Sequence, residues 1–159
     1  MKKSTIIVLL NLTMFVVLGL DAQAQPKEGI EPATTTFYVT AKVLPLDEGR
    51  LYMTYEAIGA TVNDKGEGLF HNATIRALGG MTVEKGIYKV EIGCGVLNLQ
   101  NGDKVFFIYT WAGEIKPGGT GIGKGIVTLT GGTGKCAGIQ GSYEATRYSP
   151  RSVSYTHLT

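Results

Sequence analysis

The chain has 159 residues, of which 18% are charged, with a formal net charge of +2, 23 glycines and only two cysteines. This length accommodates one domain with a hydrophobic core and is too short for two of ordinary size. Because so neutral a chain lacks the basic face of a nucleic-acid-binding protein, we expect no nucleic-acid partner and no attraction to an anionic membrane.

The N-terminus has the three zones of a secretory signal peptide. Lys2 and Lys3 form a positive n-region, residues 6–20 are uncharged and mostly apolar, and Ala22-Gln-Ala24 offers the small-residue cleavage pattern. The apolar run is shorter than the roughly 20 residues that span a bilayer. We therefore predict cleavage after Ala24 and no membrane attachment afterwards. A short basic signal is typical of bacterial export, so we expect a periplasmic or extracellular protein.

The C-terminus has an unusual composition. Residues 153–159 (VSYTHLT) resemble an in-frame translation of the transposon adapter used in shotgun sequencing libraries, although polar tails are also common at frayed ends. We expect the native sequence to be cut near Ser152 and assign no role to Tyr155 or His157. The predicted organisation is a signal peptide (1–24), a polar leader (25–35), a β-barrel domain (36–152) and an adapter-derived tail (153–159).

The segment between these ends alternates between apolar and polar residues with period 2, which is typical of half-buried β-strands, and has no helical period. Turn signals separate the strands, the clearest being Asp47-Glu-Gly49, Asn63-Asp-Lys-Gly66, Glu84-Lys-Gly86, Asn101-Gly102 and Lys116-Pro-Gly-Gly119. Seven or eight short strands predict an antiparallel sandwich or barrel, and the many glycines favour the barrel. The candidate strands are 37–43, 51–57, 69–78, 81–92, 96–99, 104–111, 122–129 and 141–147.

The segment Gly131-Gly-Thr-Gly-Lys-Cys136 invites comparison with phosphate-binding loops. The Walker frame requires glycine at position 129, which is Leu129, and Ser or Thr at position 136, which is Cys136. The residues after Gly138 have strand character, so the helix that a dinucleotide fingerprint requires is missing. We therefore interpret this segment as a glycine-lined turn between strands and expect no cofactor.

The same glycines carry a resemblance to a known family. Residues 123–142 (GKGIVTLTGGTGKCAGIQGS) resemble the "GxGxxxxTGGTGxFAGxxGxG" stretch of the allene oxide cyclase and dirigent-like barrels, and Asn101–Tyr109 resembles the family's "DGDxVxxxY" strand entry. Cys136 departs from the aromatic residue usual in the family. The resemblance implies a single antiparallel eight-stranded β-barrel with an apolar cavity at one mouth, and cyclase or stereo-directing activity in some members. If the chain is truncated, its last strand is missing.

Strand alternation also sorts side chains by face. The predicted inward sets contain Leu51, Met53, Tyr55 and Ala57; Leu69, His71, Ala73, Ile75 and Ala77; Tyr88, Val90 and Ile92; and Val105, Phe107, Tyr109 and Trp111. Glu56, Arg76 and Glu91 are predicted to face solvent. Several aromatic groups and one imidazole on an apolar face suit a planar or lipid-like ligand. The candidate ligand-binding residues are Tyr55, His71, Tyr88, Tyr109 and Trp111, which could equally be ordinary core residues.

The remaining polar residues argue against other chemistries. One native histidine and no Cys-x-x-Cys pair predict no metal site, and no Gly-x-Ser-x-Gly elbow is present to support a hydrolase. Cys94 and Cys136 could form a disulfide after export or remain as free, buried thiols.

Three functions remain open after these exclusions. The leading hypothesis is binding of a small hydrophobic or aromatic molecule. The alternatives are a cofactor-free cyclase or isomerase, in which His71 or Tyr109 steers the product, and a homo-oligomer whose interior is merely packed.

Overall fold

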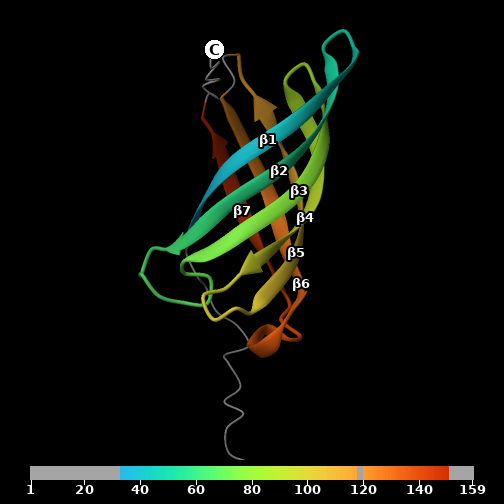
Figure 1. Ribbon diagram of the computed structural model, residues 1–159. Helices are drawn as coiled ribbons and strands as arrows, with labels where there is room; N and C mark the ends of the chain where they lie inside the picture. The colour runs from blue at the N-terminus through green and yellow to red at the C-terminus, as the bar shows by residue number, and fades with distance from the viewer. Residues whose placement is uncertain (1–32, 118–119, 151–159) are drawn as a thin grey trace, which may run out of the picture. The chain divides into compact units, whose positions relative to one another are not determined.

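A computed structural model describes residues 33–117 and 120–150 (Figure 1). The predicted signal peptide, most of the predicted leader and the adapter-like tail lie outside the described residues. Apart from one 3-10 turn, η1 (Gly134–Cys136), the regular elements of the described part are seven antiparallel strands in one sheet, in chain order. The all-β prediction is confirmed. The strands are β1 (Ala33–Asp47), β2 (Arg50–Asn63), β3 (Ala73–Glu84), β4 (Ile87–Asn98), β5 (Lys104–Ile115), β6 (Gly121–Gly132) and β7 (Gly141–Ser149).

The sheet of described residues is open. Within residues 33–117 and 120–150, β1 pairs only with β2 and β7 pairs only with β6. The predicted closure into an eight-stranded barrel is therefore unconfirmed.

Two predicted boundaries were wrong. Strand β1 begins at Ala33, inside the predicted leader, because Thr34, Thr35 and Thr36 are β-branched and pair with β2; the Thr35 and Thr61 hydroxyls lie 2.9 Å apart. The predicted break between strands 69–78 and 81–92 was also wrong, because Gly79 and Gly80 lie inside β3. The predicted turn Glu84-Lys-Gly86 is confirmed: it joins β3 to β4, and the positive φ angles of Lys85 and Gly86, 49° and 83°, suit a two-residue hairpin.

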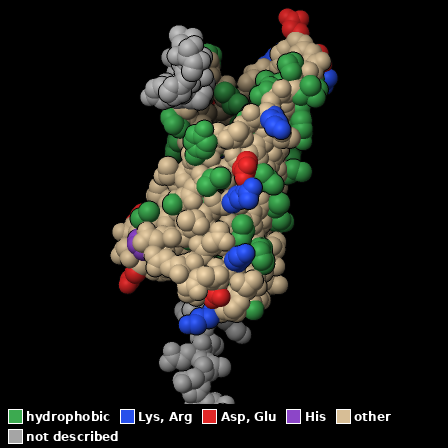
Figure 2. Space-filling view, viewed as in Figure 1, with side chains coloured by type: hydrophobic (Ala, Val, Ile, Leu, Met, Phe, Trp, Pro, Cys, Tyr) green, Lys and Arg blue, Asp and Glu red, His purple; other side chains and the backbone are tan. Residues whose placement is uncertain are grey.

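The sheet curls, so that one face is concave and buries alternate side chains (Figure 1). At one end the β2–β3 connection and η1 cover this face, and Leu69, Phe70, Cys136 and Ile139 join its hydrophobic core. Towards the opposite end, where the β1–β2 and β3–β4 turns lie, a smaller cluster forms around Met81, Val83 and Tyr88. On the outward-facing side, hydrophobic side chains are scattered among polar atoms (Figure 2).

Pairs of glycines on the concave face make room for side chains that lie across the strands. Gly79 and Gly93 are neighbours in register between Tyr55 and Tyr109. Gly113 and Gly123 occupy the same position between Tyr88 and Arg147. A Cβ atom at any of these four glycines would overlap a tyrosine hydroxyl. The glycines therefore allow aromatic side chains from distant strands to meet over the backbone.

Replacement of Gly123 by alanine tests this packing. The new Cβ atom would overlap only the Tyr88 hydroxyl oxygen; the next atom, Cζ of the same tyrosine, lies 3.3 Å away. We expect Gly123→Ala to lower the free energy of unfolding by about 1–3 kcal/mol, and by clearly less in a Tyr88→Phe background, which lacks that oxygen. Urea denaturation of the four proteins gives the coupling energy. Equal costs in both backgrounds would contradict the proposed packing.

Candidate functional site

The most unusual residue of the concave face is Glu91, whose side chain is completely buried. The β4–β5 pairing shifts register between Tyr88 and Glu91, so both residues face inward while Lys89 and Val90 face outward. Such a bulge reverses the alternation of the strand beyond it. The predicted outward position of Glu91 and the predicted inward positions of Val90 and Ile92 were therefore wrong; Val90 and Ile92 are 62% and 60% exposed.

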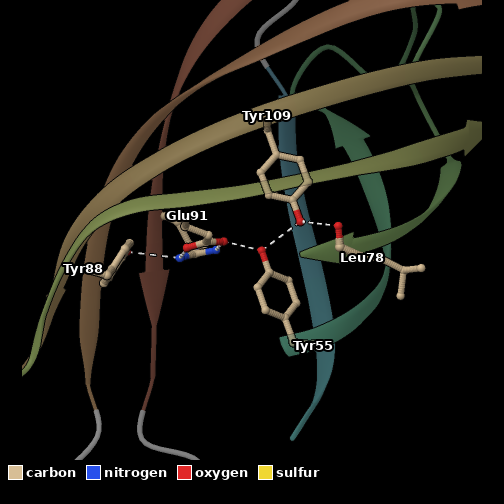
Figure 3. A network of polar contacts seen from close by, with 6 residues as sticks. Tyr55, Leu78, Tyr88, Glu91 and Tyr109 are labelled. Carbon is tan, nitrogen blue, oxygen red and sulfur yellow. Dashed lines mark hydrogen bonds and ion pairs between the residues drawn. The ribbon is translucent and has the colours of Figure 1, made fainter. Parts of the chain in front are cut away.

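Glu91 is paired on both carboxylate oxygens. Arg147, which reaches it from β7, donates from Nη1 to Oε1 at 2.8 Å and from Nη2 to Oε2 at 2.5 Å. The Tyr55 hydroxyl donates a further, short hydrogen bond to Oε1. A bidentate arginine fixes both the position and the plane of a carboxylate, so Glu91 is held rigidly (Figure 3).

A chain of hydroxyls extends from this ion pair. The Tyr55 and Tyr109 oxygens lie 2.8 Å apart, and the Tyr109 oxygen lies 3.1 Å from the carbonyl oxygen of Leu78 (Figure 3). Each hydroxyl carries one proton. Because Tyr55 donates its proton to Glu91, the single proton of Tyr109 serves either Tyr55 or Leu78.

Arg147 also contacts aromatic side chains. Its Nη2 donates to the Tyr88 hydroxyl at 3.1 Å, and its guanidinium carbon lies 5.8 Å and 5.1 Å from the ring centroids of Tyr88 and Trp111. Both distances are within the range of cation–π attraction. We refer to Tyr55, Tyr88, Glu91, Tyr109 and Arg147 as the central polar cluster.

The protonation states of this cluster follow from its burial and its charges. Burial raises the pKa of Tyr55 far above its usual value, and the hydrogen bond to Glu91 adds to the shift. Burial also raises the pKa of Tyr109. Burial alone would lower the pKa of Arg147, but the hydrogen bonds and charge of Glu91 offset it and raise the pKa. At neutral pH the two tyrosines and the arginine are therefore hydrogen-bond donors and not bases.

An apolar hollow lies at the end of the sheet that holds the β1–β2 and β3–β4 turns. Its volume is about 450 Å³, within the range of small-molecule sites, and charged residues of the turns stand at its rim. Three of its lining residues, Leu51, Val83 and Ile115, pack in the same cluster as Tyr88 and Trp111. We call this the open-end hollow; it is lined by Pro45, Asp47, Gly49, Arg50, Leu51, Val83, Lys85, Gly86 and Ile115. A larger depression of about 700 Å³ lies mainly on the outward-facing side, around Tyr52, Leu78 and Ile92.

The structure brings four of the five predicted site residues together. Tyr55, Tyr88 and Tyr109 are buried on the concave face, and Trp111 is half-buried beside Arg147. His71 lies instead in the β2–β3 turn at the covered end, where its Nδ1 accepts a hydrogen bond from the Asn63 amide at 3.2 Å. The predicted strand over 69–78 was wrong in its first four residues, and the inward position of His71 was wrong with it.

The sequence reasoning missed Glu91 and Arg147. Arg147 carried a usable signal, since alternation places it on the same face of β7 as Tyr143 and Ala145. Glu91 carried none, because the bulge that turns it inward does not appear in the periodicity. The predicted solvent-facing positions of Glu56 and Arg76 are confirmed, and the two side chains form an ion pair at 2.5 Å.

The two cysteines are free thiols. Cys94 is exposed, whereas Cys136 is buried among the core residues at the covered end. Burial and the nearby charge of Asp103 raise the pKa of the Cys136 thiol. The sequence left open a Cys94–Cys136 disulfide or two free thiols, and the structure has the free thiols.

Removal of Arg147 would leave a buried carboxylate without its counter-charge. We expect Arg147→Met to lower the free energy of unfolding by about 3–5 kcal/mol. The matched control is Arg76→Met, which breaks the exposed pair with Glu56 and should cost less than about 1 kcal/mol. Replacing both partners, as Glu91→Leu with Arg147→Met, should recover much of the loss. Similar costs for the two arginines in urea denaturation would contradict this description of the site.

The raised tyrosine pKa values make stability depend on alkaline pH. Unfolded tyrosines ionise near pH 10, whereas Tyr55 and Tyr109 keep their protons to higher pH in the folded protein. Stability should therefore fall as pH rises above about 10, because only the unfolded chain loses these protons. Tyr55→Phe or Tyr109→Phe should each reduce this fall by up to about 1.4 kcal/mol per pH unit. Chemical denaturation between pH 9 and 11 measures the slope; an unchanged slope in both variants would contradict the buried environment of these hydroxyls.

Comparisons of the chain with protein-family models, with curated proteins and with solved structures found no match. The resemblance to the allene oxide cyclase and dirigent-like barrels therefore rests on the sequence motifs alone. The described residues contain no helix with the length and apolarity needed to cross a membrane.

Proposed function

We propose that this chain is an exported protein that binds a small hydrophobic or aromatic molecule on its concave face, in the open-end hollow beside Trp111. The observation that carries the proposal is an apolar hollow whose lining residues Val83 and Ile115 pack in the same hydrophobic cluster as Tyr88 of the buried polar cluster. Small-molecule sites combine these two features, because apolar walls supply binding free energy while a few fixed polar groups orient the ligand.

A purely structural role accounts poorly for the central polar cluster. A buried ion pair rarely stabilises a protein more than apolar residues of similar volume do, because both charges lose their hydration. Glu91 and Arg147 are therefore costly parts of a core that aliphatic side chains could fill. Their retention beside a hollow favours binding over packing alone.

The finer fold assignment belongs to the same proposal. A curled seven-stranded meander with a glycine-rich β6–β7 connection suits a barrel of the allene oxide cyclase-like type, in which another strand would lie between β1 and β7. The support is the motif over 123–142 and the edges of β1 and β7, which are unpaired within the described residues. Such a strand would remove two exposed edges.

A second candidate is a cofactor-free cyclase or isomerase. The observation that favours it is the hydroxyl of Tyr109, whose one proton has two acceptors within hydrogen-bond distance. Hydroxyls that can redirect a proton in a water-poor site could steer a reactive intermediate. Under this alternative Tyr109→Phe changes the product ratio without unfolding the protein.

The binding proposal can be tested with the single tryptophan of the chain, because Trp111 packs in the same hydrophobic cluster as the hollow's lining residues Val83 and Ile115. N-phenyl-1-naphthylamine, an uncharged apolar probe, should quench Trp111 emission saturably. Ile115→Asp should weaken binding at least tenfold, because it places a charge in the hollow. Ile92→Asp, on the outward-facing side, is the matched control and should leave affinity unchanged.

Two results would count against the binding proposal. One is quenching that does not saturate, which would indicate non-specific contact with the probe. The other is an equal loss of affinity in Ile115→Asp and Ile92→Asp, which would place the probe outside the hollow.

A further inference from the structure

We propose that the ligand of the open-end hollow is an apolar anion, whose body lies on the apolar wall of the hollow and whose single acidic group binds the ammonium group of Lys85. This inference rests on the proposed binding function and names the chemical class of the ligand. It follows from the charged groups that line the hollow, from the partners that they already have, and from the way in which the turns hold Lys85.

The hollow combines an apolar wall with a charged rim. Its apolar side chains are those of Pro45, Leu51, Val83 and Ile115. Its charged side chains, all exposed, are those of Asp47, Arg50 and Lys85. An apolar body can therefore bind the wall while a polar end group of the ligand stays at the hydrated rim.

Lys85 is the charged lining residue that has no partner. Nη2 of Arg50 lies 2.6 Å from Oδ2 of Asp47, so these two charges offset each other. Within residues 33–117 and 120–150 the Lys85 ammonium group forms no ion pair and no hydrogen bond. The lining thus carries one positive charge that no other lining residue offsets, and an anion complements it.

The other acidic residues of the turns lie outside the lining of the hollow. Glu48 and Glu84 directly precede Gly49 and Lys85 in the chain, but neither lines the hollow. Their charges oppose an approaching anion from a greater distance than Lys85 attracts it, and the interaction between two charges weakens with their separation. We therefore expect a preference for anions that is moderate in size.

Backbone hydrogen bonds fix the position of Lys85. The β1–β2 and β3–β4 turns lie side by side (Figure 1), and the Lys85 amide donates to the carbonyl oxygen of Gly49 at 2.7 Å. The Ile115 amide donates to the carbonyl oxygen of Gly86 at 2.6 Å. The Lys85 stem crosses Gly49, since its Cγ lies 3.4 Å from the position that a Cβ atom there would occupy. Such a stem packs on apolar surface and leaves its ammonium group in water.

Three naphthalene ligands of similar size test the charge of the ligand: the anion 2-naphthoate, the uncharged 2-naphthamide and the cation 2-naphthylmethylammonium. Displacement of N-phenyl-1-naphthylamine measures their affinities. The native protein should bind the anion about threefold more tightly than the amide, as expected for an exposed ion pair, and the cation more weakly than the amide. Raising the ionic strength from about 0.01 M to about 1 M should remove most of this preference, because salt screens exposed charges.

Substitutions of Lys85 assign the preference to one side chain. Lys85→Met keeps an aliphatic stem and should bring 2-naphthoate to the affinity of the amide, while leaving the amide unchanged. Lys85→Glu should reverse the order, so that the cation binds most tightly. The matched control is Lys89→Met, which removes the same charge from the outward-facing side of β4 and should change none of the three affinities.

The outcomes separate this inference from the binding function on which it rests. Equal affinities of the native protein for 2-naphthoate and the amide would overturn the inference and leave the binding function intact. The same holds for an equal loss of 2-naphthoate binding in Lys85→Met and Lys89→Met, and for a bound probe that 2-naphthoate does not displace. Absence of binding by the probe and by all three ligands would instead contradict the proposed function itself.

Discussion

The burial of the Glu91 charge is the constraint on which the rest of this structure depends. A carboxylate without water needs partners on both oxygens, and no neighbour in its own strand can supply them. Its partners come from β2 and β7, which lie two and three strands away from β4 in the sheet. The sheet must curl to bring them together, and the bulge in β4 must turn Glu91 inward. The curvature of the sheet, the bulge in β4 and the Glu91–Arg147 ion pair therefore depend on one another.

Glycine makes this arrangement sterically possible. In an ordinary sheet every second residue places a Cβ atom on the inner face, which keeps rings from lying across neighbouring strands. The two glycine pairs remove that obstacle at two points. One lies between Tyr55 and Tyr109, and the other between Tyr88 and Arg147. Glycine weakens a strand by itself, but here the aromatic rings cover the exposed backbone. The abundance of glycine thus reflects side-chain packing as much as turns.

How far the sequence could predict this molecule depends on whether the signal was local. Alternation placed Tyr55, Tyr109 and Trp111 correctly, because β2 and β5 follow a regular pleat around them. It failed at Val90 and Glu91, since a bulge arises from pairing with neighbouring strands and leaves no mark on the strand's own period. It failed at His71 because an apolar run before Ala73 was read as strand, although its residues cover one end of the core from a turn. The Glu91–Arg147 ion pair could not be predicted from strand periodicity, because it joins residues 56 positions apart.

The division of donors within the cluster is what connects structure to function. Tyr55 and Tyr109 complete their hydrogen bonds inside the protein and so fix Glu91, which in turn fixes Arg147. A guanidinium held on one side by a carboxylate cannot turn away from its remaining partner, Tyr88, so its unused N–H groups keep a constant direction. Such rigidity reduces the ordering that a ligand must impose on binding. The buried ion pair therefore acts best as a support that fixes Tyr88, which packs in the same hydrophobic cluster as the hollow's lining residue Val83.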